Sequence, residues 1–239
     1  MNGLAQIHHH IVTCNTCERL RTYCQRIAQE KKKAHRNDTY WGRPVPGFGD
    51  PQARVLIIGL APAAHGANRT GRVFTGDGPL GSGDFLMRAM HANGFANIPT
   101  CTHPDDGLVL TDAFISAAVR CAPPDNKPTP DEIAACHPHL VAETNALPRI
   151  RIIVALGRLA FDAAWRLLAD RGIVVRPKKM FGHDVAYSVK GPEVRGRRPG
   201  EITVIGSYHP SRQNTNTGKL TEAMMRAVFA RTRRMLNAE

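Results

Sequence analysis

The sequence predicts a three-layer α/β/α fold built around a central, mostly parallel sheet of four strands. Apolar runs of strand length recur along the chain, and helical patterns separate them. Runs without polar alternation are typical of parallel strands buried on both faces. Strands that alternate with helices imply a sheet covered by helices on both sides. We expect the 239 residues to form one domain, because this length suits a single α/β core and no internal repeat divides it.

Each predicted strand is rich in Val, Ile or Leu and is bounded by Gly, Pro or charge. The strands are expected at residues 55–60, 110–119, 152–156 and 202–207, and the helices at 85–92, 129–136, 159–169 and 220–236. Thr129 and Glu132 indicate a capping box, with Pro130 at the first helical position. Residues 190–200 are rich in Gly, Pro and Arg and predict a mobile loop before the last strand.

The charge predicts a polyanionic partner. The formal net charge is +12 at neutral pH, an excess that favours contact with phosphates. The cations gather in two runs: Lys31, Lys32, Lys33 and Arg36 in the first, and Arg171, Arg176, Lys178, Lys179, Lys190, Arg195, Arg197 and Arg198 in the second. No apolar run approaches the roughly 18 residues of a membrane helix, and residues 1–12 lack a signal peptide's apolar stretch. We therefore expect a cytoplasmic protein with no membrane partner.

Two polar, glycine-rich segments directly follow predicted strands. The first loop is residues 59–77, and the second loop is residues 209–218. Because ligands of open α/β sheets bind beyond the carboxyl ends of the strands, we expect both loops to line one cleft. They offer a carboxylate at Asp77, an aromatic ring at Phe74 and imidazoles at His65 and His209. This mixture suits N-glycoside hydrolysis of a flipped base, although composition alone fits a nucleotide hydrolase equally well.

Longer stretches of the sequence distinguish between these possibilities. Residues 59–77 (GLAPAAHGANRTGRVFTGD) and 209–218 (HPSRQNTNTG) resemble the two signature motifs of the uracil-DNA glycosylase superfamily, specifically its family 5, the B-type enzymes of bacteria and archaea. Residues 120–128 (RCAPPDNKP) and the paired N-terminal cysteines belong to the same pattern. The resemblance covers the chain from about Cys14 to the last helix. The Lys-Arg-Arg-Ile-His insert of the cross-linking branch is absent, which favours an enzyme that turns over.

The resemblance implies a DNA glycosylase of base excision repair that flips uracil out of DNA and hydrolyses the N-glycosidic bond. Asp77 matches the carboxylate that holds the attacking water, and Phe74 matches the aromatic platform for the flipped base. His209 matches the histidine that donates to the base O2 as charge develops there. Hypoxanthine and xanthine are expected as further substrates, and double-stranded DNA as the partner, with single-stranded DNA left open.

The chain departs from the family pattern where other branches read the base edge. Leu60, Ala61, Ala63 and Ala64 occupy a stretch that carries a polar residue elsewhere, and Ala117 replaces an asparagine. We expect Ala63 to line the base and Asn126 to be the replacement reader. Arg212 and Asn214 match the loop that enters the minor groove and are expected to bind substrate. The loss of strict base-reading groups implies a pocket that accepts more than uracil.

The chain has six cysteines, which in a cytoplasmic protein are not expected to form disulfides. The resemblance implies a [4Fe–4S] cluster held by Cys14, Cys17, Cys121 and Cys136, although four thiolates would equally suit zinc. Cys24 is an alternative for one ligand, and Cys101 is interpreted as an ordinary loop thiol. The expected role of the cluster is to tie residues 1–45 to the domain, with a redox role as the alternative.

Two competing functions are kept open. A non-catalytic iron–sulfur protein that binds damaged DNA would retain the charge and the cysteines but lose the chemistry. A redox enzyme would need a second cofactor site, yet no G-x-G-x-x-G fingerprint follows any predicted strand. No lysine stands in either loop at a position suited to a Schiff base, since Lys219 lies beyond the second one. We therefore expect a monofunctional enzyme that leaves an abasic site and acts as a monomer.

Overall fold

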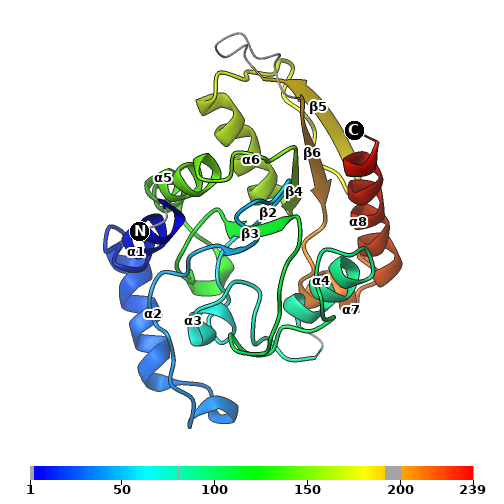
Figure 1. The fold of residues 1–239 in the computed structure, drawn as a ribbon. Helices are drawn as coiled ribbons and strands as arrows, with labels where there is room; N and C mark the ends of the chain where they lie inside the picture. Colours follow the sequence, from blue (N-terminus) through cyan, green and yellow to red (C-terminus); the bar gives the residue numbers. More distant parts are fainter. Residues whose placement is uncertain (1–2, 80, 192–200, 239) are drawn as a thin grey trace.

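The computed structural model describes residues 3–79, 81–191 and 201–238. In this part of the chain a mixed sheet lies between layers of helices, with strand order β1-β3-β2-β4-β6-β5 (Figure 1). The strands are β1 (Phe48–Gly49), β2 (Val55–Gly59), β3 (Ala113–Ala117), β4 (Ile152–Leu156), β5 (Val185–Lys190) and β6 (Glu201–Ser207). β2, β3, β4 and β6 run parallel, while β1 and β5 pair antiparallel at the two edges.

Alternate side chains of the inner strands enter two separate cores, as the period of a strand requires. Ile57 and Val154 pack with the side that carries α4 (Ser82–His91) and α8 (Glu222–Asn237). Leu56 and Ile153 pack with the side that carries α5 (Pro130–Asn145) and α6 (Arg158–Asp170). The two helical layers are visible on either side of the sheet in Figure 1.

Two helices precede the sheet. α1 (Gly3–Val12) packs against α5, and α2 (Glu18–Glu30) packs against the short α3 (Ala67–Thr70) of the first loop. A third, smaller core holds Leu20, Cys24, Val119, Cys121, Ala122 and Cys136. The N-terminal segment is thus packed onto the end of β3 and onto α5. The remaining elements are two short 3₁₀ helices, η1 (Lys33–His35) and η2 (Pro124–Asn126), and the short α-helix α7 (Arg212–Asn216).

The predicted α/β/α architecture and its four parallel strands are confirmed, but within the described residues the sheet has six strands rather than four. β5 escapes prediction because its side chains are only partly buried at an edge, so its sequence lacks a continuous apolar run. The strand expected at 110–119 is shorter, Ala113–Ala117. The capping box at Thr129 and Glu132 is present, and α5 continues past the expected end at 136 to Asn145.

The structure contains the other predicted helices, whereas most of the predicted loop lies outside the described residues. The predicted helices at 85–92, 159–169 and 220–236 correspond to α4, α6 and α8, while α1 and α2 were not predicted. The mobile loop expected at 190–200 falls, from residue 192 onward, outside the described residues, as do Arg195, Arg197 and Arg198. None of the helices in the described ranges combines the length and the apolar character that crossing a membrane requires.

Candidate functional site at the carboxyl edge of the sheet

The first and second loops meet at the edge where β2 and β6 end. The rings of Phe74 and His209 stack, with centroids 5.9 Å apart and planes inclined by 27°. On the same edge Arg212 Nη2 donates to the main-chain oxygen of Asp77 over 3.2 Å. Residues separated by more than 130 positions are therefore brought together, as expected for two loops that leave the carboxyl ends of strands in one parallel sheet.

Phe74 is held in an unusual backbone conformation. Its φ is +54°, a left-handed value that costs a bulky residue free energy and is common at functional sites. The ring lies over Gly59, the last residue of β2, where a β-carbon would come 2.9 Å from Phe74 Cε2. Glycine at position 59 therefore provides the space that lets the ring lie across the strand end and reach His209.

Asp77 is placed by two glycines. A β-carbon on Gly66 would come 1.8 Å from Asp77 Oδ1, and one on Gly81 would come 2.3 Å from Asp77 Cβ. Burial raises the pKa of the Asp77 carboxyl above its ordinary value, while the nearby guanidinium groups of Arg212 and Arg69 oppose that rise. The result is a largely desolvated carboxylate, which interacts more strongly with a developing positive charge than an exposed one does.

His209 is an uncharged imidazole at neutral pH. Burial lowers its pKa to about 4, because an apolar surrounding disfavours the charged form. Its main chain is braced by Asn214, whose Nδ2 donates to the His209 oxygen at 2.8 Å. Its β-carbon lies against Gly157, the residue after β4, at 3.5 Å from a β-carbon built there. A neutral imidazole in this position keeps an N–H donor without carrying charge.

The other residues predicted to bind substrate divide into two groups. Ala63 lies in the first loop, where its oxygen accepts from the nitrogens of Gly66 and Asn68, and Arg212 is exposed beside Asp77. The Asn214 amide donates to the main chain of its own loop.

Asn126, by contrast, is exposed in η2 with a φ of +57°. That turn is tied to α2 through Arg19, which donates to the Lys127 oxygen, and among the described residues no recorded contact joins Asn126 to Phe74, Asp77 or His209.

The basic run at residues 31–36 lies beside the first loop. Tyr40 Oη and His65 Nδ1 are 3.1 Å apart, and the main-chain nitrogen of Lys32 donates to the same Tyr40 hydroxyl at 3.4 Å. Burial, together with the charge of Lys32, lowers the pKa of His65. Positive charge from the N-terminal segment therefore stands next to the loop that carries Asp77.

Sequence reasoning missed the support beneath the first loop. The buried guanidinium of Arg72 donates to Thr75 Oγ1 at 2.8 Å, to the Pro104 oxygen at 2.9 Å and to Asp106 Oδ2 at 2.7 Å. Both Arg72 and Thr75 are nearly or fully inaccessible. The sequence shows only an arginine within the loop, because its partner Asp106 is more than 30 positions away.

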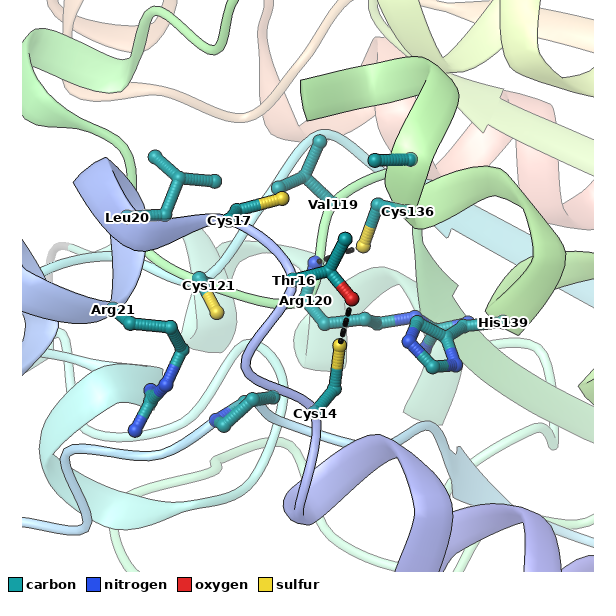
Figure 2. A pocket seen from close by; sticks show the side chains of 12 residues that line it. Cys14, Thr16, Cys17, Leu20, Arg21, Val119, Arg120, Cys121, Cys136 and His139 are labelled. Carbon is teal, nitrogen blue, oxygen red and sulfur yellow. Dashed lines mark hydrogen bonds between the residues drawn. The ribbon is translucent and has the colours of Figure 1, made fainter. Parts of the chain in front are cut away.

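A separate cavity collects the four cysteines predicted to bind a cluster. Cys14 and Cys17 come from the N-terminal segment, Cys121 follows β3, and Cys136 lies on α5; all four line the same cavity, here called the cysteine cavity. Figure 2 shows their side chains around one space. All six cysteines of the chain are free thiols. Cys24 does not line the cavity, and its thiol donates to the Ala122 oxygen at 3.6 Å. Within the described residues no three His, Cys, Asp or Glu side chains are grouped closely enough to hold one metal ion.

Two arginines border the cysteine cavity with unused donors. Arg21 Nε and both Nε and Nη1 of Arg120 are buried without a hydrogen-bond partner in the described structure, and both residues line the cavity. The main-chain nitrogen of Arg120 donates to Cys136 Sγ at 3.2 Å. The Arg120 side chain runs along the cavity toward His139 (Figure 2). Leaving a buried donor unsatisfied costs about 1–3 kcal/mol. Positive charge and free donors around four thiols fit an anionic group.

Comparison with known proteins identifies the family. The model of the uracil DNA glycosylase superfamily matches residues 46–233. A type-5 uracil-DNA glycosylase of Thermus thermophilus is 44% identical over 94% of this chain and 94% of its own length. One from Mycobacterium bovis is 44% identical over 99% of this chain and 83% of its length. One from Pyrobaculum aerophilum is 39% identical over 92% of this chain and 88% of its length.

Proposed function

The chain belongs to the uracil-DNA glycosylase superfamily, and on this premise we propose that it releases uracil from DNA by hydrolysing the N-glycosidic bond. The observation that carries the proposal is the meeting of Phe74, Asp77 and His209 from two distant loops at one sheet edge. A platform for a flat base, a buried carboxylate and a neutral donor are what this reaction needs.

Asp77 acts on the sugar side of the bond. As the bond from C1′ to the base nitrogen breaks, its electron pair leaves with the base and the sugar gains oxocarbenium character. The Asp77 carboxylate stabilises that positive charge and orients the water that adds to C1′. The proton that water loses passes to the carboxylate. Burial strengthens both effects, because few water molecules screen the charge.

His209 acts on the base side. Negative charge develops on the departing base, and a neutral imidazole N–H directed at its O2 stabilises that charge without first having to lose a proton. Phe74 offers its ring as the stacking surface for the flipped base. Its stacking on His209 couples the platform to the donor, so that the base is held where the hydrogen bond forms.

The substrate range extends beyond uracil to hypoxanthine and xanthine, and the enzyme is monofunctional. Support comes from Ala63 and Ala117, which stand where a strict reader would carry a polar side chain. Lys219 packs over the Tyr208 ring at 5.0 Å, so its amine is directed to an aromatic face. The expected product is therefore an intact strand with an abasic site, cut only after alkaline treatment.

The partner is double-stranded DNA. The net charge of +12 and the run at residues 31–36 beside the first loop support phosphate contact on the side where Asp77 lies. Arg212, exposed at the start of α7 and bonded to the Asp77 main chain, is proposed to hold the opened strand while the base is out of the stack.

The cysteine cavity is proposed to hold a [4Fe–4S] cluster through Cys14, Cys17, Cys121 and Cys136. Within the described residues the thiols are not grouped closely enough for a single metal ion, but four of them share one cavity with the unused donors of Arg21 and Arg120, an arrangement that suits a larger anionic cluster. When bound, the cluster would supply a covalent link between the N-terminal segment, the end of β3 and α5. Iron and sulfide assays on the purified protein distinguish it from zinc.

A panel of duplex oligonucleotides tests the proposed activity. Each carries one central uracil, hypoxanthine, xanthine or normal base, and each reaction is split into halves with and without alkali. We expect strand cleavage at the damaged bases and only after alkali. Intact strands for every duplex, despite tight binding, would instead favour the damage-binding protein without chemistry.

A further inference from the structure

Cys101 is tied to the first loop by more than packing. Its thiol donates to the Phe74 oxygen at 2.8 Å, and its own oxygen accepts from the Gly76 nitrogen at 3.0 Å. Its nitrogen donates to Asp84 Oδ1 at 2.8 Å, which anchors it to the first turn of α4. The side chain is only 2% exposed. The residue therefore grips the loop on both sides of Thr75.

Phe74 needs such a grip because its backbone is strained. A left-handed φ at a bulky residue costs of order 1–3 kcal/mol and persists only where the surroundings impose it. The main-chain oxygen of Phe74 is enclosed on the side of α4 as well, since a β-carbon on Gly83 would stand 1.9 Å from it. With the carbonyl fixed at that side, the ring is directed toward Gly59 and His209.

The thiol stays a donor throughout the physiological range. Burial, and the charge of Asp84, raise the pKa of the Cys101 thiol far above its ordinary value. The thiol therefore stays protonated, and among the described residues its hydrogen-bond acceptors are the Phe74 oxygen and Asp84 Oδ1, which is 3.7 Å from the sulfur. Cys101 does not line the cysteine cavity.

We propose that Cys101 is a positioning residue for base release: its thiol hydrogen bond holds the Phe74 carbonyl so that the ring forms the platform beside His209. The inference rests on the proposed function, and it assigns a role that acts through Phe74 rather than on the substrate. The hydrogen bonds to Phe74 and Gly76, the anchor on Asp84 and the pairing of Asp106 with Arg72 make residues 101–106 the support of residues 72–76.

Two substitutions separate donation from packing. Cys101→Val removes the donor and leaves an apolar side chain that is larger by about one methyl group, whereas Cys101→Ser keeps a donor in a smaller side chain. Under single-turnover conditions on a uracil duplex, we expect Cys101→Val to slow base release by about tenfold or more, since small displacements of a positioned group have effects of this size. Cys101→Ser is expected to stay within about threefold of the unchanged protein. The opposite order, with Val active and Ser impaired, would show that Cys101 only fills space.

A double-mutant comparison distinguishes positioning from general damage. In a Phe74→Ala background the platform is gone, so adding Cys101→Val should slow base release no further. Fully multiplied effects would contradict the proposal. Thermal unfolding of each variant identifies any that is not folded at the assay temperature, in which case Cys101→Ala, which also lacks the donor, takes the place of Cys101→Val.

The outcomes also separate this inference from the proposed function. If the unchanged protein releases no uracil, the proposed function itself fails. If the unchanged protein is active and Phe74→Ala is impaired, yet Cys101→Val matches the unchanged protein, only the role of Cys101 is overturned.

Discussion

The Oδ1 atom of Asp77 lies 1.8 Å from the position that a β-carbon on Gly66 would occupy. Position 66 and the carboxylate therefore compete for one space, and only glycine leaves it to Asp77.

Gly66→Ala should therefore displace the carboxylate. We expect the single-turnover rate of uracil release to fall by about 100-fold, the loss that follows from moving a catalytic group by about 1 Å, while DNA binding changes little. Gly3→Ala is the matched control, because a β-carbon on Gly3 meets nothing within 4 Å. Equal rates for the two variants would show that the Asp77 carboxylate need not occupy this space.

The pH dependence of base release follows from His209 and Asp77. His209 has a pKa of about 4, so it stays neutral as pH falls through about 6.5, where an ordinary histidine would charge. Asp77 must be ionised, and burial raises its pKa above the ordinary value. We therefore expect no inflection of the single-turnover rate from His209 near pH 6.5, and a fall of the rate in acidic buffer as Asp77 becomes protonated. An inflection near 6.5 that disappears in His209→Ala would contradict this.

The same shift makes a prediction for stability. The pKa of His209 is lower in the folded protein than in the unfolded chain, so between about 6.5 and 4 the unfolded chain binds more protons. Stability from this residue is present above about pH 6.5 and is lost as pH falls toward 4. His209→Asn should therefore lose less thermal stability than the unchanged protein when both are moved from neutral to acidic buffer. Identical losses in the two proteins would overturn the assignment.

Arg21 is predicted to support the group in the cysteine cavity. Its unpartnered Nε lies buried there, so Arg21→Met removes a charge and a donor. We expect iron and sulfide per chain to fall, and a chelator to strip the remainder faster. Arg26→Met on the same helix is the control, because Arg26 pairs with Glu30 and lies over the Tyr23 ring outside the cavity. If Arg21→Met and Arg26→Met retain equal amounts of iron and sulfide, Arg21 does not support the group in the cysteine cavity.

Glu143 is predicted to be a main stabilising residue of the core. It is fully buried and accepts from the Gly47 nitrogen at 2.7 Å, from Ser116 Oγ at 2.8 Å and from Arg120 Nη2 at 2.7 Å. Glu143→Ala would leave the Arg120 charge buried and unpaired, which costs about 3–5 kcal/mol.

Thermal unfolding measures this cost. At about 2–4 °C per kcal/mol for a chain of this size, the melting temperature should fall by about 6–20 °C. Glu222→Ala, which breaks the exposed pair with Arg88 at 2.7 Å, should cost only about 0–1 kcal/mol. A similar drop for both variants would contradict the importance of burial.

The sequence predicted those features that depend on local pattern. The inner strands carry continuous apolar runs, and Thr129 with Glu132 forms the capping box within four residues, so both were visible without coordinates. The two loops were found because each directly follows such a strand. Their meeting at Phe74 and His209 follows from the parallel order of β2, β4 and β6.

The remaining features depend on contacts between distant positions. Nothing near Cys101 in the sequence indicates that its thiol meets the Phe74 oxygen, because 27 positions separate them. The same holds for Arg72 and Asp106. Asn126 was chosen from its string alone, and the structure puts it in an exposed turn beside α2. Its role as the reader of the base edge stays a prediction.

The central claim is that Asp77 performs the chemistry of a glycosylase. The most direct test is base release from a duplex with one central uracil by the unchanged protein and by Asp77→Asn, with DNA affinity measured in parallel. We expect Asp77→Asn to bind the duplex as tightly and to release uracil at least about 100-fold more slowly. Equal release by the two proteins, or none by either, would contradict it.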